Sequence, residues 1–279
     1  MRLGVLGSGS GGNAVVLEAR GTRLLVDAGL SARQLCQRLE AMEIAPDSLD
    51  GIMLSHEHSD HTRGLEVFLR KREVPVYASP LTREALSDRC GAGIDWRLFQ
   101  RGEEFEVGDI SVNSFAVPHD AVDPVGFVCG AEGTRVGLAT DFGHVTTLVR
   151  QELKGVRALF VESNYDQGLL DADTKRPWAI KQRISSRHGH LSNAQTAELV
   201  SDLVEHGLET VVLGHLSQEC NCPDLVAAVM RASSPPGKIE VYVASQEKPT
   251  GWVEVRVDAK AGRPSPKEEA VETLLWPEW

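Results

Sequence analysis

Residues 55–61 concentrate side chains of the types that bind metal ions. The segment reads Ser-His-Glu-His-Ser-Asp-His and supplies three imidazoles and a carboxylate, from His56, His58, Asp60 and His61. It follows the apolar run 51–54, which predicts a strand that delivers the motif. After a strand, residues two apart point to the same side, so His56 and His58 can hold one ion. The adjacent Asp60 and His61 must aim elsewhere, and we therefore predict two divalent cations side by side.

Three further ligand-type residues stand just beyond predicted strands, as His119, Asp141 and His215. Each follows an apolar run, where loops of neighbouring strands converge. Zinc-type ions need four or five ligands with one position open in a catalytic site, so the first motif alone is insufficient. We predict that these residues complete the metal site. Asp27 likewise ends the apolar run 23–26, where an acidic side chain needs a partner.

The elements that must position these residues alternate between strands and helices. Strands are predicted at 2–7, 14–18, 23–26, 51–54, 74–77, 104–107, 110–116, 124–130, 134–139, 157–161, 208–213 and 238–243. Helices are predicted at 32–42, 63–72, 80–89, 145–153, 192–205 and 223–232. The strands of 94–140 read as an antiparallel meander, and 164–191 reads as irregular. An α/β four-layer αββα sandwich covers both faces of every sheet. We expect one domain over 1–257 and a loose tail over 258–279.

The glycine-rich stretch 7–12 fits the spacing Gly-x-Gly-x-x-Gly through Gly7, Gly9 and Gly12. A dinucleotide site requires such a loop to open a helix. Here it opens the β-branched run 14–18, which favours a strand. We therefore predict a tight strand connection rather than a nucleotide site.

Composition limits the partners and the compartment. The net charge of −11 argues against a surface coated for nucleic acid, although it leaves room for a local basic track. Five cysteines at irregular spacing do not suggest a disulfide framework. We find no secretory hydrophobic region and no run of about 18 apolar residues, so we expect a cytoplasmic protein without a membrane span.

The ordered set of site residues resembles the five motifs of the metallo-β-lactamase-fold hydrolases over about residues 1–245. The resemblance implies that His56, His58 and His119 hold the first ion. It implies that Asp60, His61 and His215 hold the second, that Asp141 bridges both, and that Asp27 orients ligand histidines from behind. All-His/Asp ligation suits zinc or manganese, with iron as a further candidate. Two such ions lower the pKa of a water and clamp the oxygens of a phosphate, and Asp60 can accept a proton from that water.

The branch of the family is indicated by single positions. Lactam-cleaving members often place Cys where this chain has Asp141, and Glu57 departs from the flavodiiron motif. Cleavage of thioesters or lactones and cleavage of phosphodiesters remain as hydrolytic alternatives.

The segment 162–193 favours the phosphodiester. Its Glu162 after a strand and His190 before a helix resemble ribonuclease Z, which implies that Glu162 orients His190 toward a scissile phosphate. The alternative is a capped helix start with an incidental histidine. Five basic residues lie between them, and the stretch 174–191 contains no acidic residue. Basic side chains near a metal site suit a polyanionic substrate, and we expect four of them to meet it: Arg176, Lys181, Arg183 and Arg187.

Four short runs together most resemble the YycJ/WalJ group of this superfamily, which is associated with 5′–3′ exonuclease activity on DNA. They are the glycine loop, the run 54–61, Gly-His-Leu-Ser-Asn at 189–193 and Gly-His-Leu-Ser at 214–217. We therefore expect a dinuclear phosphodiesterase with nucleic acid, DNA in particular, as substrate. The alternatives are a small-molecule hydrolase of cyclic phosphodiesterase or thioesterase type, and a non-catalytic metal-binding regulatory protein.

Overall fold

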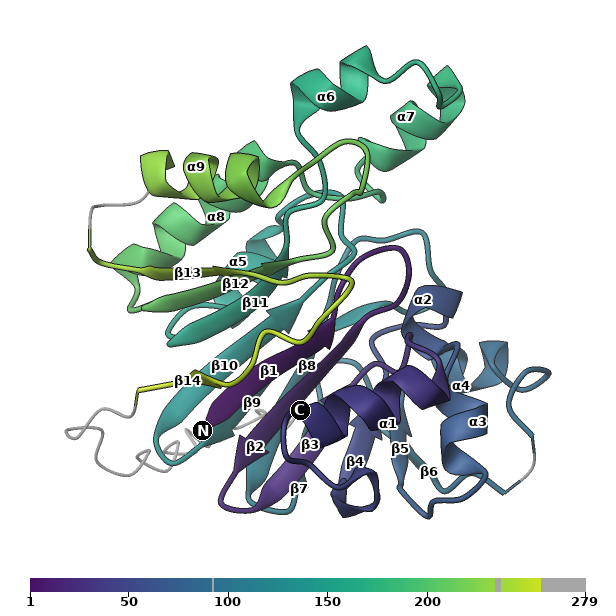
Figure 1. Cartoon of the computed structure of the whole chain (residues 1–279). Helices are drawn as coiled ribbons and strands as arrows, with labels where there is room; N and C mark the ends of the chain where they lie inside the picture. Colours follow the sequence, from purple (N-terminus) through teal and green to yellow (C-terminus); the bar gives the residue numbers. More distant parts are fainter. Residues whose placement is uncertain (92, 234–236, 257–279) are drawn as a thin grey trace, which may run out of the picture.

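The computed structural model describes residues 1–91, 93–233 and 237–256. Within them the chain forms two seven-stranded sheets that lie face to face (Figure 1). The first sheet runs, in spatial order, β14 (Val253–Glu254), β1 (Arg2–Gly7), β2 (Ala14–Ala19), β3 (Thr22–Val26), β4 (Gly51–Met53), β5 (Val76–Ala78) and β6 (Trp96–Leu98). The second runs β13 (Glu240–Val243), β12 (Thr210–Gly214), β11 (Ala158–Glu162), β10 (Thr134–Ala139), β9 (Val125–Ala131), β8 (Ile110–Ala116) and β7 (Glu104–Val107).

Helices cover the outer face of each sheet, which gives the predicted αββα order of layers. On the first sheet lie α1 (Ala32–Ala41), the 3-10 turn η1 (Pro46–Ser48), α3 (Leu65–Leu69) and α4 (Pro80–Ala85), with α2 (Ser59–Thr62) at its edge (Figure 1). On the second lie α5 (Thr147–Glu152), α8 (Asn193–Glu205) and α9 (Pro223–Ser233). None of the described helices has the length and apolar character needed to cross a bilayer.

Three of the four apolar clusters of the described residues follow from this layering. Alternate strand residues point to opposite faces, so Val15 of β2 joins the cluster between the sheets and Val16 joins the cluster under α1. In the second sheet, Val212 of β12 points between the sheets and Val211 points to the layer beneath α8. Strands buried on both faces explain why their sequences are continuous apolar runs.

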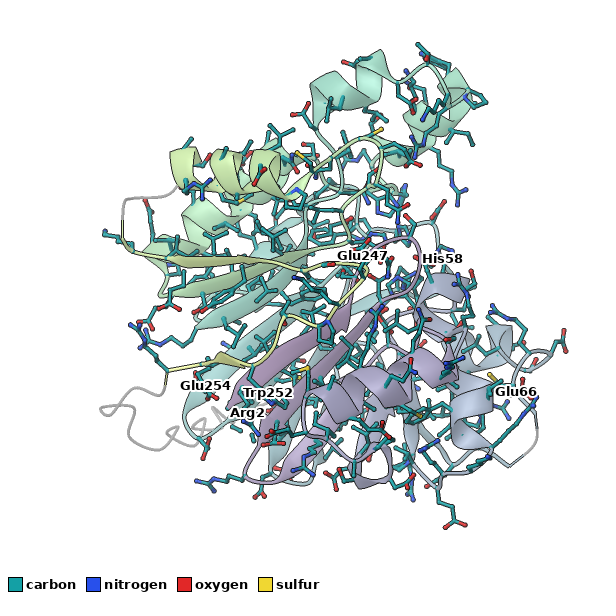
Figure 2. The ribbon with its side chains drawn as sticks, in the orientation of Figure 1. Arg2, His58, Glu66, Glu247, Trp252 and Glu254 are labelled. Carbon is teal, nitrogen blue, oxygen red and sulfur yellow. The ribbon has the colours of Figure 1, made fainter. Side chains whose placement is uncertain are left out.

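Strand direction gathers the ends of many strands at one edge. β3 to β6 are parallel to one another, and so are β10 to β13. β14 is an edge strand of the first sheet and pairs with β1. There Arg2 lies 4.1 Å over the ring of Trp252 and pairs in register with Glu254 (Figure 2). His58 lies far from this corner, at the edge where the site residues meet (Figure 2).

Two predicted segments were wrong. The helix expected over 63–72 is shorter, α3 at Leu65–Leu69, and a separate helical turn, α2, ends before it at Thr62. Gly64 between them passes so close to the 28–30 loop that a Cβ would stand 2.0 Å from the carbonyl oxygen of Leu30. The segment 164–191, expected to be irregular, contains α6 (Gln167–Ala172) and α7 (Trp178–Ile184). These helices lack the usual apolar stripe because they pack on little, and α7 buries no residue.

The sequence reading also missed two short strands. β6 pairs with β5 in the first sheet, ahead of the antiparallel strands of the second, and β14 pairs with β1. The predicted tail, 258–279, lies outside the described residues, so its boundary with the domain over 1–257 stays a prediction. We call residues 166–187, with α6 and α7, the helical arm, which projects beyond the second sheet (Figure 1).

Candidate metal centre

The residues singled out from the sequence meet at one edge of the two sheets. They follow or end strands that run in the same direction in each sheet. Asp27 follows β3 and the 55–61 motif follows β4, whereas the second sheet supplies residues after β8, β10 and β12 and the last residue of β11. These are His119, Asp141, Glu162 and His215. The topology therefore brings together side chains that are up to 188 positions apart, from Asp27 to His215.

The backbone makes an abrupt turn at three of these residues. Asp27, Asp141 and His215 have φ angles of 62°, 58° and 51°, in the left-handed region that non-glycine residues rarely enter. Each turn comes within two residues of the end of its strand. Left-handed conformations persist where the surrounding structure determines them, and they cluster at functional sites.

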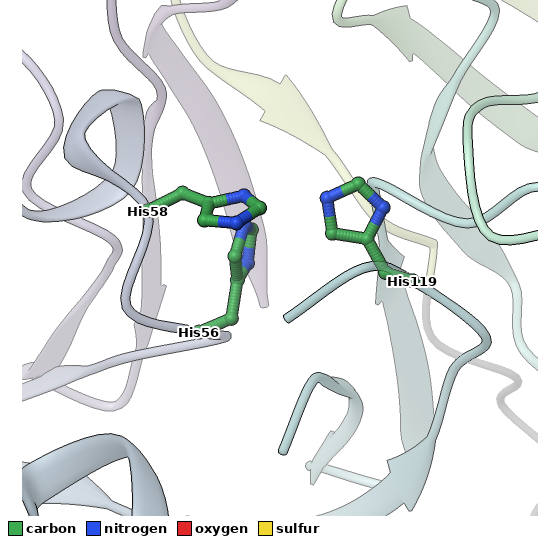
Figure 3. A group of neighbouring side chains, drawn as sticks. All are labelled: His56, His58 and His119. Carbon is green, nitrogen blue, oxygen red and sulfur yellow. The ribbon is translucent and has the colours of Figure 1, made fainter. Parts of the chain in front are cut away.

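The first group of possible ligands contains His56, His58 and His119. One ligand atom from each lies within 4.8 Å of the others. The imidazoles converge from the loop after β4 and the loop after β8 (Figure 3). His56 and His119 are buried, and the Nδ1 atom of His119 lies 3.2 Å from the carbonyl oxygen of Gly189, which leaves Nε2 for a ligand.

The second group contains Asp60, His61 and His215, whose ligand atoms also lie within 4.8 Å of one another. Asp141 stands between the groups. Its Oδ2 atom is 2.8 Å from Nε2 of His61, and its Oδ1 atom is 3.0 Å from Nδ1 of His215. Asp141 also forms a possible ligand set with His56 and His61, so it connects the two groups.

Unpaired buried atoms show that this arrangement suits metal ions. His56 Nε2, His215 Nε2 and Asp141 Oδ2 are buried and make no well-oriented hydrogen bond to the described residues, although Asp141 Oδ2 lies 2.8 Å from His61 Nε2. Buried polar atoms are nearly always hydrogen-bonded, so three such atoms in one place indicate ligands that face an ion. The donor set of imidazole nitrogens and carboxylate oxygens fits zinc, manganese or iron. The buried His/Asp clusters are typical of a dinuclear metal site in this type of fold.

The carboxylates control the charge of the site. Burial lowers the pKa of His56 well below its ordinary value, so this imidazole is neutral and free to bind a cation. Burial also opposes the charged form of His61, but the carboxylates of Asp141 and Asp27 outweigh it and raise the pKa of His61 to about 10. Although burial would raise the pKa of Asp141, the nearby His215 and His61 hold it well below the usual range.

Asp27 lies behind the ligand groups and contacts His61. Its Oδ2 atom is 2.7 Å from His61 Nδ1, and its two oxygens accept hydrogen bonds of 2.8 Å from the amide and hydroxyl of Ser55. With Nδ1 turned to Asp27, the Nε2 atom of His61 faces the site. This is the geometry expected of a carboxylate that orients a metal ligand.

Glu162 and His190 form a pair beside Asp141. The buried Glu162 accepts a hydrogen bond of 2.6 Å from the amide of Phe142, and its other oxygen is 2.9 Å from Nδ1 of His190. The imidazole of His190 is partly exposed to the pocket. Burial opposes ionisation of Glu162, but His190 and then His215 hold its pKa below the ordinary value. The pair therefore has the contact that the sequence resemblance implied.

Sequence reasoning missed two asparagines that hold the ligand loops. Asn164 donates a hydrogen bond of 2.8 Å to the carbonyl oxygen of His215. The side-chain nitrogen of Asn13 lies 3.2 Å from Nε2 of His61. The backbone amide of Asn13 donates a hydrogen bond of 2.7 Å to the carbonyl oxygen of Asp60. The sequence signal that could have identified Asn13 is its position directly after the glycine loop. That loop opens β2, as predicted, and brings Asn13 against the metal-ligand motif.

A pocket of about 290 Å³ opens onto the ligand groups. One side is lined by His58, Asp60, His119, Asp141, His190 and His215. The helical arm supplies another side, with Arg176, Ile180, Arg183 and Ile184. Of the four basic residues expected to meet substrate, Arg176 and Arg183 line the pocket, whereas Lys181 and Arg187 are not among its lining residues.

The basic residues of the arm have partners that the sequence did not reveal. Arg176 contacts Asp173 and Glu219, each at 2.6 Å, and Arg183 contacts Asp120 at 2.6 Å. Lys181 donates to the carbonyl oxygen of Asp171, and Arg187 lies 3.0 Å from Nε2 of His144. The arm is therefore less positively charged than the sequence of 174–191 suggests. That stretch contains no acidic residue, but acids from outside it partly neutralise its basic side chains.

Comparison with known proteins places this geometry in a family. A family model described as the Beta-lactamase superfamily domain matches residues 22–216. The exodeoxyribonuclease YycJ of Bacillus anthracis is 36% identical over 227 residues, which cover 81% of this chain and 86% of that protein. The exodeoxyribonuclease WalJ of Streptococcus pneumoniae is 35% identical over 230 residues, covering 81% and 85%.

A solved structure supports the fold independently. Zn²⁺-bound PqqB from Methylobacterium extorquens superposes with a TM-score of 0.70 at 18% identity, covering 89% of this chain and 99% of that one. At this identity the likeness shows the fold alone.

Proposed function

The chain belongs to the metallo-β-lactamase superfamily, and on that premise we propose that it is a dinuclear metal-dependent phosphodiesterase that acts on DNA as an exonuclease. The observation that carries the proposal is the contact between the buried Glu162 and His190, which lines a pocket. Members of both ligand groups and two arginines line the same pocket. A protein that only bound metal would not need this pair. The similarity to the exodeoxyribonucleases YycJ and WalJ supports DNA as the substrate.

Each ligand group is proposed to bind one metal ion. We assign His56, His58 and His119 to one ion and Asp60, His61 and His215 to the other, with Asp141 shared, and Asp27 as the support of His61. Two divalent cations held there would supply an acidified water and positive charge for a phosphate.

Two residues would move protons in the reaction. Asp60 is partly exposed to the pocket, and although burial opposes its charge, His215 and then His61 hold its pKa below the ordinary value. Its carboxylate stays ionised near neutral pH and can accept a proton from the attacking water. His190 presents Nε2 to the pocket, because Nδ1 faces Glu162. It can donate to a phosphate oxygen or protonate the leaving oxygen.

The direct test compares end-labelled single-stranded and duplex forms of DNA and RNA, with Mn²⁺ and Zn²⁺ supplied in turn. An exonuclease should shorten linear DNA from an end and leave a closed circle intact. Degradation of RNA alone, or cutting of the circle, would contradict the proposal.

The size of the pocket favours one alternative, a small-molecule hydrolase. Its volume of about 290 Å³ is at the lower end for ligand sites, so a cyclic phosphodiester or a thioester would fit. This alternative predicts rapid turnover of a cyclic dinucleotide or an acyl thioester with no cleavage of linear DNA. A non-catalytic regulatory protein, in contrast, should turn over neither class although it binds metal.

A further inference from the structure

The first ligand group is assembled from both sheets. His56 and His58 stand on the loop after β4 of the first sheet, whereas His119 comes from the loop after β8 of the second (Figure 3). The loop that carries His119, residues 117–124, belongs to neither a helix nor a strand. Its position opposite the motif therefore depends on individual contacts rather than on the hydrogen bonds of a regular element.

Glu57, which stands between the two histidines of the motif, makes one of these contacts with its side chain. Its Oε1 atom accepts a hydrogen bond of 3.0 Å from the backbone amide of Val122, three residues after His119. Its Oε2 atom is buried and makes no well-oriented hydrogen bond to a described residue. Val122 itself is 52% exposed, so packing of its side chain does not hold the loop. The bond to Val122 is therefore the contact that accounts for a carboxylate at position 57.

The backbone of the motif is fixed independently of this carboxylate. The hydroxyl of Thr62 lies within hydrogen-bond distance of the carbonyl oxygens of Glu57 and His58, at 3.2 and 2.9 Å. A backbone hydrogen bond of 3.0 Å from Val125 to Ser55 fixes the point where the loop ends and β9 begins. Removal of the carboxylate should therefore leave the motif in place and release the part of the loop that carries the third histidine.

On its other side the loop contacts the segment that leads to the proposed proton donor. The carbonyl oxygen of Gly189 lies 3.2 Å from Nδ1 of His119, and the amide of Asp120 donates a hydrogen bond of 3.1 Å to the carbonyl oxygen of His188. A loop released from Glu57 would keep these contacts to the second sheet. The distance from His119 to the two imidazoles of the motif would then no longer be fixed.

We propose that Glu57 is a positioning residue of the metal centre, which holds His119 within reach of His56 and His58 and so sets the affinity of the first ion. Glu57 itself touches neither ion nor substrate and acts through His119. This inference rests on the proposed division of the ligands between two ions, and it adds a residue that belongs to neither ligand group.

Titration of the metal-free protein with Zn²⁺, followed by calorimetry, tests this role. Glu57→Ala should weaken the affinity for one of the two ions about tenfold to 100-fold, as is usual when a group that orients a metal ligand is lost. The affinity for the other ion should be unchanged. Glu57→Gln should retain most of the affinity, because an amide oxygen can accept the same bond from Val122. Glu66→Ala, which removes an exposed carboxylate on α3, is the matched control and should bind both ions like the wild type.

Two further measurements separate positioning from general damage to the fold. Circular dichroism of metal-free Glu57→Ala should match that of the wild type. Hydrolysis of bis(p-nitrophenyl) phosphate by this variant should need about tenfold to 100-fold more Zn²⁺ for half its maximal rate and should approach the wild-type rate at saturation. A residue with only a structural role would instead lower the rate at every Zn²⁺ concentration.

Three results would overturn the inference. The first is wild-type affinity for both ions in Glu57→Ala. The second is an equal loss of affinity for the two ions, which would indicate a damaged fold. The third is a Glu57→Gln variant as weak as Glu57→Ala, which would assign the effect to charge instead of the bond to Val122. If the wild type binds fewer than two ions, the proposed dinuclear centre is wrong, whereas two ions in the wild type and an unaffected Glu57→Ala contradict the positioning role alone.

Discussion

The metal centre and the helical arm face the same pocket, but they are built in different ways. His61 is fully buried, and Asp27 and Asp141 both contact its ring at 2.8 Å or less. On the arm, α7 buries no residue. The arm contacts the body of the molecule through the partly or largely exposed side chains of Arg176 and Arg183 and through a small apolar cluster that includes Leu170 and Ile184. The fold fixes the groups that would perform the chemistry, whereas the groups that would meet the substrate can adjust.

The strongest test of this contrast is Asp141→Asn in the metal centre. Asparagine also tolerates the left-handed conformation found at position 141, so the fold should survive. The loss of a charge shared by both ligand groups should lower phosphodiester turnover by about 10³-fold or more, since metal stabilisation is worth several kcal/mol. Turnover of bis(p-nitrophenyl) phosphate, circular dichroism and metal content are the measurements. His58→Ala should lose activity comparably, and wild-type turnover in either variant would contradict the metal mechanism.

The next effect is expected at the border of the two regions, with His190→Ala. Loss of a proton donor should lower phosphodiester turnover by about 100-fold, within the range of general acid catalysis. Metal content should be retained, because Asp141 and His215 keep their other contacts. His188→Ala is the matched control, since this exposed histidine lies two residues away. Equal rates in the two variants would return His190 to the helix-start interpretation.

Asp27→Asn tests whether the carboxylate of Asp27 orients His61 for metal binding. An amide can still accept from Ser55 but cannot supply charge to His61. Zinc affinity should fall about tenfold to 100-fold, as is common for residues that orient metal ligands. Competition with a chromophoric chelator measures it. Asp88→Asn, at an exposed position after α4, should leave the affinity unchanged.

The smallest effect is expected on the arm, with Arg183→Gln. DNA affinity should fall a few-fold and the slope of log affinity against log salt should lessen by about one, because a phosphate contact is lost. The effect is modest because Arg183 already pairs with Asp120. Arg97→Gln, an exposed arginine on β6, provides the control. An unchanged slope in Arg183→Gln would mean that the arm does not bind phosphate through this residue.

The same contrast explains what the sequence could predict. His-x-His-x-Asp-His and the ligand-type residues after apolar strands are local patterns, and they led to the family and to the αββα fold. The helices of the arm were missed because segments that pack on little carry no apolar period. The partners of Arg176 and Arg183 were missed because Glu219 and Asp120 come from distant loops. Asn13 and Asn164 act through backbone contacts that no spacing rule describes.

The left-handed backbone at Asp27, Asp141 and His215 has a consequence for evolution. Residue types that enter this conformation most readily without being glycine are Asn, Asp and His, so the backbone and the metal make overlapping demands. If a duplicated gene lost its activity, selection for ligands would end, but selection for the turn would continue. Inactive descendants of such a protein should therefore carry Asn or Gly at these positions more often than Ala or an aliphatic residue.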